Sequence, residues 1–291
     1  MQIGKIKIDS INTGLFGLDG GAMFGVVPKP LWSKAYHPGD DRNRIPLASR
    51  PLLIQFDNYK ILIDDGNGIK YDAKKIDIYD FDLEKSNPDN NLKQFGITRT
   101  DITHVILTHL HFDHCGGSTI LNNGKIEPTF PNAKYYVQKQ QYEHAIKPTE
   151  KDAGSFILND YAPLKEFGML ELLDGEGELF PNIFVIPTNG HTPSMQMVKI
   201  SDQGQTILYI ADLIPTHSHI PYPYILGFDN FPLTTLEEKK KYLPQIYEEG
   251  WTIALEHDMK YQACTIKPNA KGKGFEFDKE VIITDANLHE L

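Results

Sequence analysis

The stretch "THLHFDHCGG" at residues 108–117 is the segment on which the interpretation of this chain depends. Within six positions it holds three histidines and one aspartate: His109, His111, Asp113 and His114. Histidine is scarce in the chain as a whole, with 11 in 291 residues. Imidazole nitrogens and carboxylate oxygens are ligands that Zn²⁺ and related divalent ions accept. Because side chains two positions apart in an extended chain project to the same side, we expect His109 and His111 to bind one ion together.

The flanking sequence predicts that this motif lies at the end of a buried strand. The run "HVILT" (104–108) before it is nearly all apolar, as in a strand buried on both faces. Gly116 and Gly117 after it permit a sharp turn. Cys115 stands beside a possible ligand, and we expect it to pack as a small apolar residue rather than to bind metal.

Three more residues of metal-binding type occur where later predicted strands end. His191 follows "IFVIPT" (183–188), Asp212 ends "QTILYIAD" (205–212), and His257 follows the run "WTIAL". Loops at strand ends are where a rigid scaffold presents functional side chains. Five histidines and two aspartates in all are enough for two adjacent metal sites that share one carboxylate.

Composition limits the function classes. The net charge of −10 argues against general binding to nucleic acid or to an anionic membrane surface. The two cysteines, Cys115 and Cys264, make no disulfide framework, which favours a reducing compartment. The N-terminal "MQIGKIKIDSINTG" lacks the apolar run of a signal peptide, and no stretch approaches the ~18 apolar residues of a membrane span. We therefore expect a cytoplasmic protein.

The rest of the chain predicts a strand-rich α/β protein with one domain over residues 1–291. Two strand-like runs flank Asp57-Asn58 in "PLLIQFDNYKILIDDGNG" (51–68), which predicts a hairpin. Further strands are predicted at 134–138, 195–200 and 251–258, helices at 138–147 and 233–250, and a surface insertion at 71–91. A capping box of Thr234 and Glu237 is expected to open the second helix, and Pro244 to kink or divide it.

The ordered set of these motifs resembles the metallo-β-lactamase-fold hydrolases. It consists of HxHxDH (109–114), GH (190–191), Asp212 and His257, and Asp65-Gly66 in "LIDDGNG" (62–68) looks like the family's early Asp-Gly element. The stretches "LDGGAMFGVVPKPLW" (18–32) and "LIPTHSHIPYPY" (213–224) are similar to the quorum-quenching N-acyl-homoserine-lactone lactonases, and to methyl-parathion-hydrolase-like enzymes. The resemblance implies an αββα sandwich: two mixed β-sheets packed face to face, with helices on both outer faces.

The resemblance also implies a dinuclear hydrolase. His109, His111 and His191 would hold one divalent ion, Asp113, His114 and His257 the other, and Asp212 would bridge them. Zn²⁺ is the first expectation, and Mn, Fe and Co accept the same ligands. Two such ions share a hydroxide that attacks a lactone or a small ester, N-acyl-homoserine lactones being the leading substrates. Asp113 and Asp212 are the expected catalytic residues, since Asp113 would also pass a proton to the leaving group.

Other residues are expected around these ligands. Asp65 is predicted to orient a ligand histidine. Residues predicted to contact substrate, with ordinary core packing left open for each, are His219, Tyr222, Met23, Phe24 and Trp32. His217 could also reach the pocket, and a role in surface or loop packing is as well supported as substrate contact for it.

Three alternatives remain at this level. The same metals could serve a phosphodiester or phosphotriester hydrolase. The chain could instead be a non-catalytic metal-binding protein, or hold a diiron redox site. The expected partner is a small-molecule ester or lactone, with no nucleic acid and no membrane, and a homodimer is possible.

Overall fold

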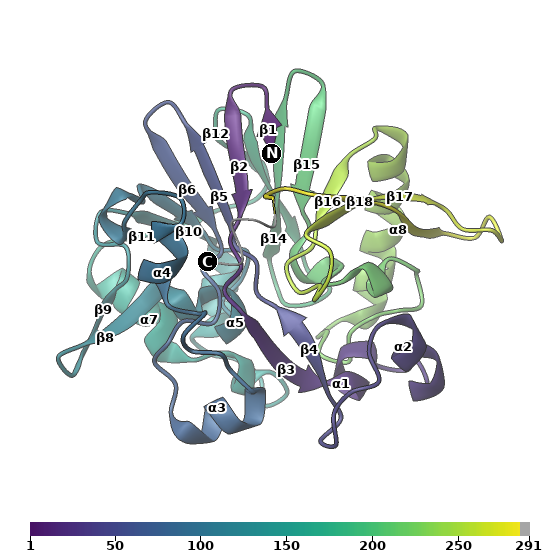
Figure 1. Cartoon of the computed structure of the whole chain (residues 1–291), viewed down its shortest axis with the longest axis horizontal. Helices are drawn as coiled ribbons and strands as arrows, with labels where there is room; N and C mark the ends of the chain where they lie inside the picture. The colour runs from purple at the N-terminus through teal and green to yellow at the C-terminus, as the bar shows by residue number, and fades with distance from the viewer. Residues whose placement is uncertain (286–291) are drawn as a thin grey trace.

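Two seven-stranded β-sheets pack face to face in the computed structural model of the chain, which describes residues 1–285 (Figure 1). The first sheet holds, in spatial order, β1 (Gln2–Ile3), β2 (Ile6–Ser10), β5 (Leu52–Phe56), β6 (Tyr59–Ile63), β7 (His104–Ile106), β10 (Lys134–Gln138) and β11 (Leu170–Leu173). The second holds β12 (Gly177–Phe180), β13 (Ile183–Thr188), β14 (Met195–Asp202), β15 (Gln205–Tyr209), β16 (Thr252–Ala254), β17 (Ala263–Pro268) and β18 (Phe275–Val281). Strands β6, β7, β10 and β11 run parallel, as do β15 and β16, while the other pairs are antiparallel. Both sheets are therefore mixed, as predicted.

Apolar side chains on the facing surfaces hold the two sheets together. Ile8 and Ile54 of the first sheet share one fully buried cluster with Val198 and Ile207 of the second. Leu53, one position along β5, points to the opposite face and joins a separate cluster beneath helices. Burying a side chain of this size stabilises the fold by ~1.5–3 kcal/mol. One cluster joins the two sheets, and the other joins the first sheet to its helices.

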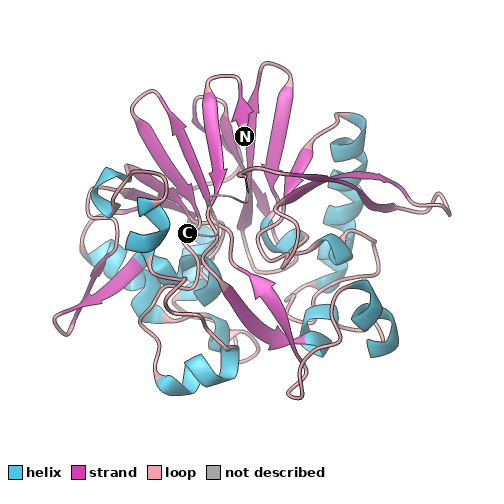
Figure 2. Cartoon of the chain, in the orientation of Figure 1, coloured by secondary structure: helices cyan, strands magenta, loops and turns pink. Residues whose placement is uncertain are grey.

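Helices cover both outer faces (Figure 2). The first sheet carries α4 (Pro88–Lys93), α6 (Lys139–Ala145) and α7 (Leu158–Glu166), and the second carries α8 (Pro232–Glu248). The predicted αββα architecture is confirmed. Among residues 1–285, we find no helix with the length and hydropathy that a membrane crossing requires.

A third group of elements closes one end of the sandwich, at the bottom of Figure 1. It contains the two-stranded ribbon β3 (Leu15–Asp19) and β4 (Arg44–Ala48), with α1 (Gly20–Phe24), α2 (Lys29–Ala35) and α3 (Ala73–Tyr79). Their core includes Phe16, Phe24, Trp32 and Phe81. The segment 71–91, expected to be a surface insertion, therefore contributes a buried aromatic to this region. The remaining hairpin, β8 (Thr119–Asn122) and β9 (Lys125–Pro128), forms a separate two-stranded sheet that contacts α7.

The structure corrects the expected start of helix 233–250 and excludes its division at Pro244. The helix begins at Pro232, after the N-cap residue Phe231, so Thr234 lies inside the first turn and does not cap. Pro at the first helical position needs no backbone N–H, which favours this start. Pro244 does not divide the helix. The neighbouring Leu243 is fully buried against the second sheet, and this packing outweighs the one backbone hydrogen bond that a proline removes.

Candidate metal centre

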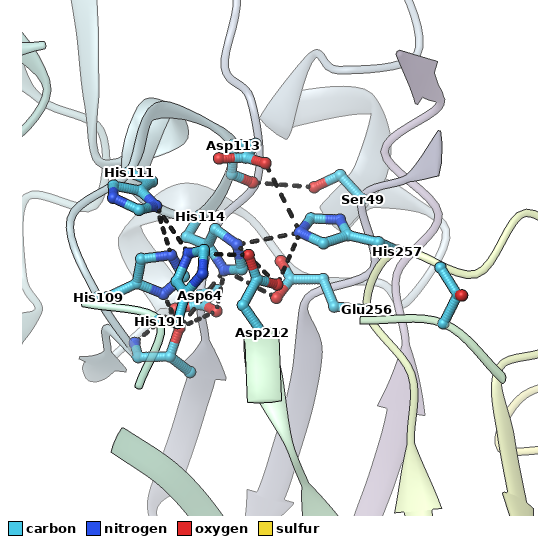
Figure 3. A network of polar contacts seen from close by, with 12 residues as sticks. Ser49, Asp64, His109, His111, Asp113, His114, His191, Asp212, Glu256 and His257 are labelled. Carbon is cyan, nitrogen blue, oxygen red and sulfur yellow. Dashed lines mark hydrogen bonds and ion pairs between the residues drawn. The ribbon is translucent and has the colours of Figure 1, made fainter. Parts of the chain in front are cut away.

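The ends of four strands bring all seven predicted ligands to one edge of the sandwich. The loop after β7 carries His109 and His111 and leads into α5 (Phe112–Cys115), which carries Asp113 and His114. His191 follows β13, Asp212 follows β15 and His257 follows β16. Each of the seven side chains is buried. Figure 3 shows that they point toward one another.

Three histidines form the first group. His111 Nδ1 lies 3.0 Å from His109 Nε2 and 3.1 Å from His191 Nε2. Ring nitrogens this close cannot all carry a proton, so lone pairs face a common point.

Asp113, His114 and His257 form the second group. His257 Nε2 lies 3.0 Å from His114 Nε2 and 3.6 Å from Asp113 Oδ2. In both groups the ligand atoms all lie within 4.8 Å of one another.

Asp212 stands between the two groups and offers one oxygen to each. Its Oδ2 lies 3.2 Å from His191 Nε2, and its Oδ1 lies 3.3 Å from His257 Nε2 and 3.5 Å from His114 Nε2. The preceding Ala211, two residues after the end of β15, adopts a left-handed conformation with φ 49°. Such backbone is costly for a residue with a Cβ and is concentrated at functional sites.

The outer ring nitrogens have partners of their own, which fixes the tautomers. His191 Nδ1 lies 2.8 Å from Asp229 Oδ1, and His257 Nδ1 lies 2.8 Å from the carbonyl oxygen of Ala48. Because the outer nitrogen donates to these oxygens, the inner nitrogen keeps its lone pair for a cation. The hydroxyl of Thr108, 3.0 Å away, is the partner of His109 Nδ1.

Asp64, rather than Asp65, is the early aspartate that contacts a ligand histidine. Asp64 Oδ2 lies 3.0 Å from His114 Nδ1, and Glu256 Oε2 lies 2.8 Å from the same nitrogen. The carboxylate of Asp65 accepts a hydrogen bond from Ser118 instead. The prediction for Asp65 missed by one position because Asp64 has a φ of 55°, which rotates successive side chains out of strand alternation.

The electrostatics favour the metal-binding form at His109, His111 and Asp212, and the protonated form at His257. Burial, together with the neighbouring imidazoles, holds the pKa values of His109 and His111 well below the usual range, so both are neutral. Burial alone would raise the pKa of Asp212, but His114 and the other surrounding histidines hold it well below its usual range. Against the lowering effect of burial, Asp212 raises the pKa of His257 to about 9, so the ring carries a proton that a cation bound at Nε2 would replace.

These residues fit two divalent cations. Asp212 Oδ1 is buried and has no hydrogen-bond partner among residues 1–285, which is costly unless a cation compensates it. The first group supplies three nitrogens and the second two nitrogens and an oxygen, both ordinary donor sets for Zn²⁺.

The sequence model of the Metallo-beta-lactamase superfamily matches residues 45–254, which include six of the seven residues. This chain belongs to that superfamily. A solved structure of a probable metal-dependent hydrolase from Staphylococcus aureus is 30% identical, with a TM-score of 0.86 over 97% of this chain and 100% of that one. The structure of AidC, a dizinc quorum-quenching lactonase, has a TM-score of 0.80 at 22% identity, over 97% of both chains, and supports the fold.

The curated relatives match over a shorter length. The N-acyl homoserine lactonase AiiA of Bacillus thuringiensis subsp. kurstaki is 28% identical over 185 residues, 62% of this chain. The match spans 65% of that protein.

A cavity of about 360 Å³ lies over the two groups, and His111, Asp113, His191, Asp212 and His257 line it. Its other walls are mainly apolar and include Met23, Ile78, Tyr79, Phe112, Leu226 and Phe228. The opening of the metal-binding groups onto an apolar cavity suits a small organic substrate.

Of the five residues predicted to contact substrate, Met23 lines this cavity. Phe24 and Trp32 are core residues, their parallel rings stacked with centroids 5.4 Å apart. Tyr222 packs against Phe275. His219 is 1% exposed and stacks on Phe24, so it cannot reach a substrate. The aromatic pattern of this segment therefore builds a core rather than a cavity wall.

The remaining side chains near the motif have structural partners. Cys115 is a fully buried free cysteine, as predicted. His217 Nδ1 lies 2.5 Å from Asp258 Oδ2, which ties down its loop. Gly117 is needed for close approach, because a Cβ there would lie 2.2 Å from the carbonyl oxygen of Asp65.

Sequence reasoning missed three carboxylates that contact the ligand histidines: Asp64, Asp229 and Glu256. Asp64 and Glu256 each adjoin a residue that the motifs had marked, and this adjacency is the signal that could have found them. Asp229 is 38 residues from His191 and has no such signal.

Proposed function

We propose that this protein is a metal-dependent hydrolase that opens a lactone ring or cleaves a small ester, with N-acyl-homoserine lactones as the first substrates to test. The observation that carries the proposal is the position of Asp212, one oxygen toward each of two three-residue groups, on the floor of an apolar cavity. The lactonases among the relatives support the choice of substrate.

Two divalent ions, most simply Zn²⁺, would be held by the two groups, with Asp212 shared. When bound there, they would lower the pKa of a shared water toward ~7 and polarise the substrate oxygen. The chain supplies no serine or cysteine nucleophile in this scheme, and needs none.

The residues of the chain would bind the substrate and move a proton. The apolar walls exclude water from the reacting bond and hold the substituent of the substrate. Asp113 Oδ2 faces His257, so Asp113 Oδ1 is the atom placed to accept a proton from the attacking water and to pass it to the leaving oxygen.

The test combines metal analysis with a substrate panel. Metal content by inductively coupled plasma should approach two equivalents per chain, and less than one equivalent would exclude the dinuclear proposal. A panel of homoserine lactones, a phosphotriester and a phosphodiester should show preference for the lactones.

Three other outcomes would contradict the proposal. Preference for either phosphoester would replace the proposed reaction with phosphoester hydrolysis. No turnover with two bound ions would favour a non-catalytic metal-binding protein. Hydrolysis by His109→Ala at the parent rate would refute the site.

A further inference from the structure

Lys239 of α8 is a lysine with no exposed surface. Its Nζ lies 2.6 Å from the carbonyl oxygen of His219, 2.7 Å from that of Pro221 and 2.9 Å from that of Tyr224. Burying a cationic side chain is expensive, and three carbonyl acceptors on one short segment compensate for it. The contacts fasten the segment 219–224 to the helix.

His219 carries this connection onward to α1. Its Nε2 donates to the carbonyl oxygen of Met23 at 2.9 Å, while its Nδ1 accepts from the hydroxyl of Thr216 at 2.7 Å. The ring also lies parallel to Phe24, with centroids 4.6 Å apart. Burial lowers the pKa of His219 to about 3, so the ring is neutral and this single tautomer satisfies both nitrogens.

The two segments so connected form adjacent parts of the cavity wall. Ala22 and Met23 come from α1, and Leu226 and Phe228 from the chain just beyond Tyr224. The backbone N–H of Gly227 donates to the carbonyl oxygen of Ala22 at 2.8 Å.

Gly25 confirms how closely these segments approach. A Cβ at this position would lie 2.7 Å from the carbonyl oxygen of Ile225. A small shift of the 219–224 segment should therefore displace the residues of α1 that line the cavity.

We propose that Lys239 is a positioning residue, which fixes the segment 219–224 and, through His219, the α1 wall of the cavity, and thereby sets which substrate substituents fit. The inference rests on the proposed function for its substrate readout only. None of the hydrogen bonds of Lys239 reaches a residue of the two metal-binding groups, so loss of Lys239 should change substrate preference and leave metal content unchanged.

The test replaces Lys239 by Met, which keeps the length and removes the donor. For a homoserine lactone with a decanoyl chain we expect KM to rise about tenfold with kcat little changed, because only uniform binding to the wall is lost. For γ-butyrolactone, which has no acyl chain to contact the wall, both constants should stay at the parent values. Lys240→Met is the matched control, because Lys240 is the next residue on α8 and pairs with Glu237 at the surface.

A second variant, His219→Phe, keeps the stacking on Phe24 and removes the hydrogen bond to Met23. It should reproduce the change in preference, and the double variant should show less than the summed effect, because both residues act through one connection. It also preserves the test if Lys239→Met does not fold.

Hydrogen exchange provides a readout independent of activity. The amide of Gly227 and the peptide 20–28 should exchange faster in both variants than in the parent and in Lys240→Met. Exchange at the parent rate, or a KM that rises equally for both lactones, would overturn the inference. If the parent opens no lactone, the proposed function fails and exchange alone decides the role of Lys239.

Discussion

Replacing Asp229 by Asn should weaken binding at one of the two proposed metal positions and spare the other. Asp229 is 2% exposed, its Oδ1 lies 2.8 Å from His191 Nδ1, and its Oδ2 accepts a hydrogen bond from Thr235 at 2.6 Å. An asparagine can turn its amide NH₂ toward His191 Nδ1. That contact favours the tautomer with hydrogen on Nε2, the atom that faces His111 and would bind the ion.

The expected magnitude follows from the geometry. Loss of an outer partner of a ligand histidine typically costs about 10–100-fold in metal affinity, or about 1.4–2.7 kcal/mol. His191 belongs to the first group, and the second group keeps Asp64 and Glu256 on His114. The whole loss should therefore fall on one ion.

A chelator titration followed by metal analysis measures this difference. The Asp229→Asn variant should lose its first ion at about 10–100-fold lower chelator activity than the parent, and its second ion at the parent value. Asp101→Asn is the control, because the Asp101 carboxylate accepts hydrogen bonds from Thr98 at the surface and belongs to neither group. Two parallel release curves that match those of the parent would refute the reasoning.

Three further outcomes are expected. Asp212→Asn should retain fewer than two ions by metal analysis and lose about two orders of magnitude or more of lactone turnover, because both groups share this carboxylate. Gly117→Ala should lower the free energy of unfolding by about 1–3 kcal/mol in urea titrations, since its Cβ would lie 2.2 Å from the carbonyl oxygen of Asp65. Burial lowers the pKa of His219 to about 3, so between pH 6.5 and pH 3 the unfolded chain binds a proton that the folded chain does not. Stability should therefore fall as pH drops through this window, by up to about 1.4 kcal/mol per pH unit, and His219→Phe should show a shallower dependence in denaturant titrations at several pH values.

The strands could be predicted because their patterns are local. Alternation along β5 places Ile54 and Leu53 on opposite faces, and the turn residue Asp57, with a φ of 45°, is of a type that tolerates this conformation. The start of α8 could not be predicted, because the capping-box pattern at Thr234 competes with the chain direction imposed by Phe231 and Pro232. Contacts with the rest of the fold decide which residue begins the helix, and the sequence of the segment alone does not reveal those contacts.

The residues of the candidate site also fall into those that local sequence predicts and those that it does not. Histidines and aspartates directly after apolar runs were visible because a strand end presents them. Asp229 was not, because its contact with His191 depends on how the chain before α8 returns to the sheet edge. Phe24 and Trp32 were placed near substrate, since an aromatic pattern looks alike in a core and in a cavity wall.

Part of the cavity wall lies outside the superfamily match, whereas most of the metal-binding residues lie inside it. The superfamily match covers residues 45–254 and includes six of the seven residues in the two groups. Met23 and Ala22 of α1, together with Arg42 and with Arg44 at the start of β4, line the cavity before the matched region. The apolar wall residues Ile78, Tyr79, Phe112, Leu226 and Phe228 lie within it. We expect part of the proposed substrate to contact this earlier segment. Substitutions within 17–44 should therefore change substrate choice at constant metal content, so a substrate screen will discriminate best by varying the substituent that this segment contacts.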